Sequence, residues 1–343
     1  MSEIAIIGAG AWGTALAIVL GRSGRHNVRL WALEEEVCRS IRSDRMNALF
    51  LPGHHIPACV HPTNSLPEAL NAAQMVVSAI PSQHCRKIFQ TINPHLSREI
   101  LLVSATKGLE QKTLLRMTAV IEQVTKAKCR VGALSGPTFA SEVARGDPTA
   151  ITVASANPEL MHRVQAEFGD LAFRVYTNAD LVGVELGGAL KNVIAIAAGI
   201  CDGLGLGHNS IAALITRGLA EMTRLVTACG GRGETMSGLA GLGDLVLTCT
   251  GALSRNRSVG VELGRGRKLA DIIAGMHGMV AEGVFTTNAA VQLARGHGIE
   301  MPITEQVHLI LNEGKSPRDA IQDLMTRSSK SELQSPNGVS SAK

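Results

Sequence analysis

Short apolar runs alternate with helical stretches through the first half of the chain. Residues 4–7 and 28–31 predict the first two strands. Five later runs predict further strands, at 75–80, 100–104, 130–134, 150–154 and 172–176. Repeated strand and helix order predicts an α/β fold with a doubly wound parallel sheet that is covered by helices on both faces.

The pattern changes near residue 178, where long Ala, Gly, Leu and Ile segments with few strand signals begin. A chain of 343 residues exceeds the usual size of one core. We therefore expect an α/β domain at 1–180 and an all-helical domain at 181–327. The polar, Ser-rich segment 328–343 cannot bury enough surface to order itself and predicts a disordered tail.

Composition and charge exclude some functions. The net charge of +4 comes from scattered basic residues, which argues against nucleic-acid binding. The apolar segment 4–20 contains three glycines and lacks a basic leader, so we expect no membrane span. Seven widely spaced cysteines predict reduced thiols and a cytoplasmic protein. We expect no metal, although Cys59 with His54, His55 and His61 leaves a zinc site as a minor alternative.

A glycine pattern follows the first predicted strand and opens a helix. Gly8, Gly10 and Gly13 have the spacing that permits a tight turn, close approach to a pyrophosphate and close helix packing. This order of elements predicts dinucleotide binding.

The end of the second strand bears on which nicotinamide cofactor is used. Glu34 lies about twenty residues past the glycines, where a carboxylate binds the ribose of NADH and repels the 2′-phosphate of NADPH. Its alternative role is a favourable charge in the first turn of a helix. The choice between NADH and NADPH therefore stays open, with NADH favoured.

Lys191 interrupts the long uncharged stretch 186–201. An ammonium in such a segment must be paired, hydrated or used in a functional site, because burying an isolated cation in apolar surroundings costs much free energy. Gly187 and Gly188 share its helical face and predict a close neighbour there. A lysine that extends out of the helix to solvent is the alternative.

Two segments place polar groups where predicted strands end, at the edge where open α/β sheets bind ligands. Lys107 follows one strand directly, and a solvated loop lysine is its alternative role. The segment Ser135-Gly136-Pro137-Thr138 ends another strand, with Pro137 suited to the first position of a helix.

A third segment combines three glycines with Asp244, whose expected task is to orient a lysine or bond a hydroxyl. Ser254, Arg255 and Asn256 follow and offer a donor set suited to a phosphate monoester. A solvated basic turn is equally compatible with these last three residues.

Together these motifs resemble the bacterial NAD(P)-dependent glycerol-3-phosphate dehydrogenases. The resemblance covers nearly the whole chain, through GAGAWGTALA, SATKGL, SGPTFA, ELGGALKNVIAI, GLAGLGDLVLTCTGALSRNRS and AEGVFTT. It implies a Rossmann domain, a helical domain related to that of 6-phosphogluconate dehydrogenase, and a homodimer. The implied reaction is reversible NAD(P)H-dependent reduction of dihydroxyacetone phosphate to sn-glycerol 3-phosphate for phospholipid synthesis.

The resemblance also implies site residues. Lys191 would transfer the proton, with Lys107 and Asp244 beside it. Besides the three glycines and Glu34, the cofactor positions would be Ala11, Trp12, Lys107, Ala140, Arg255, Val280 and Glu282. The substrate positions would be Lys107, Gly136, Thr138, Lys191, Asp244, Ser254, Arg255 and Asn256. The chain departs from many relatives by Ala rather than Ser at position 11 and by the lack of a basic residue near positions 32 and 33.

Two other functions use some of the same features. Another dehydrogenase of the 6-phosphogluconate or β-hydroxyacid type would share both domains and a helix-borne lysine, but would act on a carboxylate. A non-catalytic nicotinamide sensor would need only the glycine turn and would leave Lys191, Asp244 and Arg255 without a task.

Overall fold

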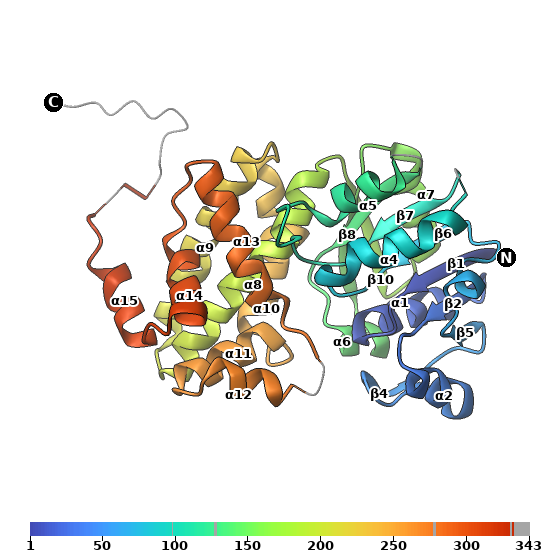
Figure 1. Ribbon diagram of the computed structural model, residues 1–343, viewed down its shortest axis with the longest axis horizontal. Helices are drawn as coiled ribbons and strands as arrows, with labels where there is room; N and C mark the ends of the chain where they lie inside the picture. The colour runs from blue at the N-terminus through green and yellow to red at the C-terminus, as the bar shows by residue number, and fades with distance from the viewer. Residues whose placement is uncertain (98, 127–128, 277–278, 330, 333–343) are drawn as a thin grey trace.

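The computed structural model describes residues 1–97, 99–126, 129–276, 279–329 and 331–332 (Figure 1). The predicted tail falls mostly on Lys330 and residues 333–343, which lie outside the described residues. Figure 1 shows two lobes side by side, one built on a sheet and one helical.

The sheet lobe contains all the strands of the described residues. They are β1 (Ser2–Ile7), β2 (His26–Trp31), β3 (Met46–Asn47), β4 (Leu51–His55), β5 (Val60–Thr63), β6 (Met75–Ser78), β7 (Leu101–Ser104), β8 (Arg130–Ser135), β9 (Thr149–Ala154) and β10 (Phe173–Asn178). Eight of them form one sheet in the order β10-β9-β8-β7-β6-β1-β2-β5, and β3 pairs with β4 in a small hairpin. All seven predicted strands are present.

Most neighbouring strands of the large sheet are parallel, which confirms the predicted fold class. One pair differs, because β9 runs antiparallel to β8. The connection between these two strands, residues 136–148, contains only the six-residue helix α6 (Ala140–Arg145). At about 1.5 Å per residue this helix is much shorter than either strand, so it does not carry the chain back along the sheet as a parallel crossover requires. The sequence analysis also missed β5 and the β3–β4 hairpin, whose strands are short and contain polar residues.

Helices cover both faces of the sheet. They are α1 (Ala11–Arg22), α2 (Glu35–Asp44), α3 (Leu66–Leu70), α4 (Cys85–Ile92), α5 (Met117–Thr125), α6 and α7 (Pro158–Phe168), with short 3-10 turns η1 (Ser82–His84) and η2 (Asn93–His95).

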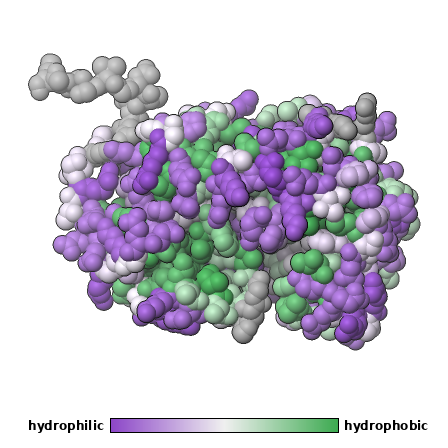
Figure 2. Space-filling model, viewed as in Figure 1, coloured by the Kyte–Doolittle hydropathy of each residue, from purple (hydrophilic) through white to green (hydrophobic). Residues whose placement is uncertain are grey.

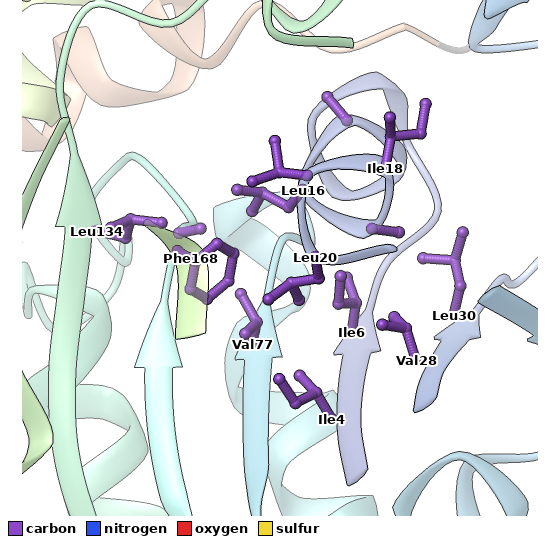
Figure 3. Packing of buried hydrophobic residues seen from close by; sticks show 14 of the residues in the cluster. Ile4, Ile6, Leu16, Ile18, Leu20, Val28, Leu30, Val77, Leu134 and Phe168 are labelled. Atoms are coloured by element: carbon purple, nitrogen blue, oxygen red, sulfur yellow. The ribbon is translucent and has the colours of Figure 1, made fainter. Parts of the chain in front are cut away.

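Alternate residues of the central strand β1 face opposite cores. Ile4 and Ile6 belong to the cluster that includes α1, whereas Ala5 and Ile7 belong to the cluster on the other face. Figure 3 shows Leu16 and Leu20 of α1 above the sheet on the same side as Ile4 and Ile6. This two-sided burial explains why the strands read as continuous apolar runs.

The second lobe is helical. It contains α8 (Leu181–Gly203), α9 (His208–Ala228), α10 (Asp244–Thr250), α11 (Arg255–Gly264), α12 (Leu269–Ala274), α13 (Glu282–Gly296), α14 (Pro302–Glu313) and α15 (Pro317–Met325), with a 3-10 turn η3 (Gly233–Ser237) and a π-helical turn η4 (Leu239–Gly243). Figure 2 shows hydrophobic residues mainly toward the middle of the visible face and hydrophilic residues over most of the rest.

Helix α8 is the centre of this lobe. Asp180 caps its N-terminus by accepting a hydrogen bond from the Gly183 N–H at 2.9 Å. Among the described helices, only α8 is long and apolar enough to span a membrane by length and composition, which the sequence analysis did not notice. Because 83% of its most apolar window is buried by the protein itself, it has the character of a core helix.

Helices α8 and α11 cross with their backbones in close contact. A Cβ added at Gly264 would lie 2.5 Å from the Ile200 carbonyl oxygen, and one added at Gly199, Gly203 or Gly260 would overlap the facing helix backbone. Any side chain at these positions would force the helices apart. The crossing therefore fixes the start of α11 relative to the segment of α8 that contains Lys191.

Candidate active site

The glycine turn has the geometry that its sequence predicts. Gly8 has φ of +113°, and a Cβ there would lie 2.8 Å from the Ala79 carbonyl oxygen. A Cβ at Gly13 would overlap the Gly8 carbonyl, so this position lets α1 pack against the turn. In contrast, a Cβ at Gly10 would meet no atom within 4 Å.

The space beside Gly10 lies at the N-terminus of α1. No hydrogen bond is made by the backbone N–H groups of residues 10–13 within the described part of the chain. Unpaired N–H groups and the positive end of a helix dipole together bind anions. These residues therefore fit the pyrophosphate of a dinucleotide.

The other predicted cofactor positions are more scattered. Ala11 and Trp12 begin α1 and are half-buried. Ala140 is the first residue of α6, which packs on the same core. Glu34 is exposed and immediately precedes α2, whose first turn holds Glu35 and Glu36. Its side chain forms no capping bond, so it is available to a ligand at the end of β2.

Neighbouring strand ends are tied together where the sheet meets the helical lobe. The Thr106 hydroxyl, just after β7, donates to the Ile80 carbonyl at 2.9 Å. Lys107 follows and donates from Nζ to the Gly136 carbonyl at 3.1 Å, beyond the end of β8. Lys107 is thus held at the carboxyl edge of the sheet, as predicted.

Asp244 joins Lys107 to Lys191. Its Oδ2 accepts from Lys107 Nζ at 2.8 Å and its Oδ1 accepts from Lys191 Nζ at 2.5 Å. Lys191 also donates to the Thr248 hydroxyl at 2.8 Å. Asp244 is 1% exposed and Lys191 5% exposed, so the cluster is shielded from water on most sides. An ammonium has three N–H donors. Each lysine therefore keeps one N–H without a partner among the described residues.

Burial changes the acidity of the buried amine. The pKa of Lys191 is lowered to about 8, because desolvation by burial and the neighbouring charge of Lys107 together outweigh the opposing effect of Asp244. Lys191 can consequently exchange a proton close to neutral pH.

The glycines beside Lys191 have the close neighbours that were predicted. A Cβ at Gly187 would lie 2.7 Å from the Ala240 carbonyl oxygen in η4. A Cβ at Gly188 would overlap the Ser135 hydroxyl at the end of β8. These glycines let α8 approach both η4 and the sheet edge, and this approach brings the two lysines to one carboxylate.

The helix position predicted for Pro137 was wrong. This residue was expected at the first position of a helix, but α6 begins at Ala140 and Pro137 lies in the preceding loop. Gly136 has φ of +157°, and its carbonyl accepts from both Lys107 and the Thr138 hydroxyl, the latter at 3.1 Å. Gly136 and Thr138 therefore shape the loop under Lys107.

The predicted phosphate donors lie at the start of α11. Ser254 is buried and caps the helix by accepting from the Arg257 N–H. Asn256 donates to the Asn192 side chain at 2.9 Å and accepts from the Gly283 N–H at 2.9 Å. Arg255 is exposed and makes no hydrogen bond or ion pair with any described residue. Arg255 is thus the member of this group with a side chain fully free for a ligand.

Glu282 links the two lobes. It is the first residue of α13, and its carboxylate accepts from the Ser82 N–H at 3.0 Å and the Ser82 hydroxyl at 2.6 Å. Burial raises its pKa, and the two hydrogen bonds from Ser82 and the charge of nearby Arg255 oppose this shift. Val280, two residues earlier in the chain, is half-buried.

Several site residues were missed by the sequence analysis. Thr248 lies one helical turn after Asp244, a spacing that could have indicated a shared partner. Asn192 follows Lys191 directly, but only the fold shows that it meets Asn256. Ser82 gives no comparable signal, because its partner Glu282 is 200 residues away.

The zinc alternative is not supported. No cluster of three or more His, Cys, Asp or Glu suited to a metal is found in the described part of the chain. The Cys59 thiol instead contacts the Gly21 carbonyl at 3.4 Å.

A Rossmann-type sheet with a pyrophosphate-binding turn, facing a helical lobe that carries a buried lysine of lowered pKa, defines a nicotinamide-nucleotide-dependent dehydrogenase. Comparison with known families makes this more specific. The model described as NAD-dependent glycerol-3-phosphate dehydrogenase N-terminus matches residues 3–161, and the one described as its C-terminus matches residues 180–322. The chain belongs to this family, which confirms the resemblance that the motifs indicated.

Individual relatives agree along nearly the full length. The glycerol-3-phosphate dehydrogenase [NAD(P)+] of Koribacter versatilis is 68% identical over 335 residues, covering 97% of this chain and 99% of the relative. The protein of the same name from Geobacter sulfurreducens is 54% identical, over 97% and 99% of the two chains. A crystal structure of glycerol-3-phosphate dehydrogenase from Coxiella burnetii is 41% identical with a TM-score of 0.91, covering 95% of this chain and 99% of that one.

Proposed function

We propose that this chain catalyses the reversible reduction of dihydroxyacetone phosphate to sn-glycerol 3-phosphate with NADH or NADPH. The observation that carries the proposal is the cluster in which Asp244 holds both Lys191 and Lys107 at the carboxyl edge of the nucleotide-binding sheet. Family membership supports the enzyme class and the nicotinamide cofactor.

The reduced nicotinamide, when bound, supplies a hydride to the carbonyl carbon of the substrate. Negative charge then develops on the carbonyl oxygen, and a protonated Lys191 beside it neutralises that charge and delivers the proton. Asp244 and Thr248 occupy two of the three N–H groups of Lys191 and direct the third. In the oxidation direction the neutral amine takes the proton back, which a pKa of about 8 permits.

The remaining residues would bind the two ligands. The turn Gly8, Gly10 and Gly13, with the N–H groups of Ala11 and Trp12, would hold the cofactor pyrophosphate. Glu34, Ala140, Val280 and Glu282 would complete the cofactor site. Arg255 and the α11 N-terminus, with Ser254 and Asn256, would hold the substrate phosphate. Lys107, with Gly136 and Thr138 beneath it, would contact both substrate and cofactor.

Broader aspects of the function are also proposals. A division near residue 180 is supported by the end of β10 at Asn178 and the start of α8 at Leu181. A cytoplasmic location is supported by the seven free thiols, which suit a reducing compartment. A homodimer and a supply of product to phospholipid synthesis rest on the family alone.

Initial rates of the purified chain test the proposal. We expect turnover of dihydroxyacetone phosphate that greatly exceeds turnover of free dihydroxyacetone, and none with 3-hydroxy acids or 6-phosphogluconate. Rates with limiting NADH and NADPH measure the cofactor preference, and light scattering measures the oligomeric state. Absence of turnover with every phosphorylated ketone would contradict the proposal and favour a nicotinamide sensor.

A further inference from the structure

Asn47, in the β3–β4 hairpin, is bound to the glycine turn although it lies more than thirty residues away in sequence. Its Nδ2 donates to the Ala9 carbonyl at 2.8 Å and to the Thr14 hydroxyl at 2.9 Å. Its Oδ1 accepts from the Phe50 N–H at 3.1 Å. Asn47 is 0% exposed, so these three bonds form without competition from water.

The bond to Ala9 controls the direction of a ligand-binding group. In a trans peptide the carbonyl and the following N–H point in opposite directions. Fixing the Ala9 oxygen toward Asn47 therefore fixes the Gly10 N–H on the opposite side of the turn. The Gly10 N–H makes no backbone or side-chain hydrogen bond within the described residues.

Two further hydrogen bonds support this contact from neighbouring helices. The Thr14 hydroxyl, one turn into α1, also donates to the Ala9 carbonyl, at 3.3 Å. On the other side of Asn47, the Ser40 hydroxyl of α2 donates to the Met46 carbonyl at 2.7 Å. Helices α1 and α2 therefore hold the Ala9–Gly10 peptide through Asn47.

We infer that Asn47 is a positioning residue for the cofactor, which presets the Ala9–Gly10 peptide so that the Gly10 N–H faces the pyrophosphate before binding. This inference rests on the proposed use of the glycine turn for a dinucleotide. Preorganised donors bind more tightly because less conformational freedom is lost on binding. Asn47 does not contact the reacting atoms, so its effect falls on cofactor affinity and not on the chemical step.

Asn47→Leu tests the inference, because it removes the polar groups at nearly constant volume. We expect the Kd for NADH, measured by titration of its fluorescence, to rise about tenfold, as for a lost buried hydrogen bond. The KM for NADH should rise in parallel, while kcat and the KM for dihydroxyacetone phosphate stay within about twofold of wild type.

Gln165→Leu is the matched control. Gln165 also donates from its side-chain amide to a backbone carbonyl, that of Val175 at 2.7 Å, but at β10 on the far edge of the sheet. It should lower the melting temperature without changing the NADH Kd. A Kd for Asn47→Leu within twofold of wild type, with a similar loss of melting temperature, would reduce Asn47 to a structural role and overturn the inference.

Thr14→Val gives a second measurement if Asn47→Leu fails to fold. It removes one donor to Ala9 and one partner of Asn47, so we expect a rise of about threefold in the NADH Kd. An unchanged Kd in that variant would also overturn the inference. If the wild-type chain itself bound no nicotinamide nucleotide, the proposed function would fail instead, which separates the two results.

Discussion

Lys191 and Lys107 share a single counter-ion, although they come from different lobes and lie 84 positions apart in sequence. Two ammonium groups on one carboxylate leave the cluster with a net positive charge. Such a charge attracts a phosphorylated substrate and stabilises an oxyanion. Burial lowers the pKa of the Lys191 amine, and the charge of Lys107 adds to this shift although Asp244 opposes it.

Removing the Lys191 amine should abolish most turnover. We expect Lys191→Met to lower kcat by about 100- to 10,000-fold, the range that a general acid contributes. The Kd for NADH should remain close to wild type, because the glycine turn is untouched. Lys112→Met, at an exposed position, is the control and should leave both values unchanged. Near-normal turnover of Lys191→Met would remove this amine from the mechanism.

The pKa of Lys191 predicts opposite pH profiles for the two directions of the reaction. Reduction needs the protonated amine, so its rate should fall as the pH rises through about 8. Oxidation needs the neutral amine, so its rate should rise over the same interval and then level off. Initial rates in both directions between pH 6 and about 10 measure these profiles. Identical pH dependence in the two directions would be incompatible with this role.

Asp244 should be required for both acidity and stability. Since its charge raises the pKa of Lys191, Asp244→Asn should move the falling limb of the reduction profile to lower pH. The variant also leaves two amines without their counter-ion, which costs about 3 to 5 kcal/mol for a broken buried pair. Rate profiles and denaturant unfolding measure the two effects separately. An unmoved pH profile in a folded Asp244→Asn protein would contradict the proposed coupling.

Arg255 should act mainly on the phosphate of the substrate. We expect Arg255→Ala to raise the KM for dihydroxyacetone phosphate by the equivalent of about 1 to 3 kcal/mol, as for a lost charged hydrogen bond. Stability should change little, because Arg255 has no partner among the described residues. The control is Arg257→Ala on the same helix, whose guanidinium pairs with Asp202 at 2.9 Å. Equal effects of the two variants on the KM would argue against a specific clamp.

The crossing of α8 and α11 should tolerate no side chain. We expect Gly260→Ala to destabilise the protein by about 3 kcal/mol or more, because the added Cβ overlaps the Ile196 carbonyl in a packed interior. Gly296→Ala, at the end of α13, is the control because no atom lies within 4 Å of the added group. It should be neutral or slightly stabilising, since alanine favours a helix over glycine. The free energy of unfolding in denaturant compares the two.

The sequence predicted the parts of the site that depend on local pattern. Three features can be recognised within a few residues of sequence. They are the glycine turn, the strand ends before Lys107 and Gly136, and the single charge of Lys191 in an apolar segment. The largely parallel sheet with helices on both faces followed from the alternation of strands with helices. These features depend on residue spacing and on the pattern of apolar residues, and both can be read from a single sequence.

Features that depend on tertiary approach could not be predicted in this way. The Asn47 contact joins a short hairpin to a turn far away in sequence, and neither strand of that hairpin is long enough to show alternation. The antiparallel β9 looks like any other apolar run. Ser254 and Asn256 were assigned to the ligand from their chemistry, but part of their hydrogen-bonding capacity is used by the protein itself.

The glycine contact between α8 and α11 has a consequence for how the enzyme can change over time. Backbone contacts between the two helices set the separation between Lys191, the proposed proton-transfer residue, and the N-terminus of α11, the proposed anion-binding site. Ordinary exchanges among aliphatic residues elsewhere in the core cannot alter that spacing gradually. The distance that a three-carbon substrate would span between these two groups is therefore held constant, while the sequence of the surrounding core can change.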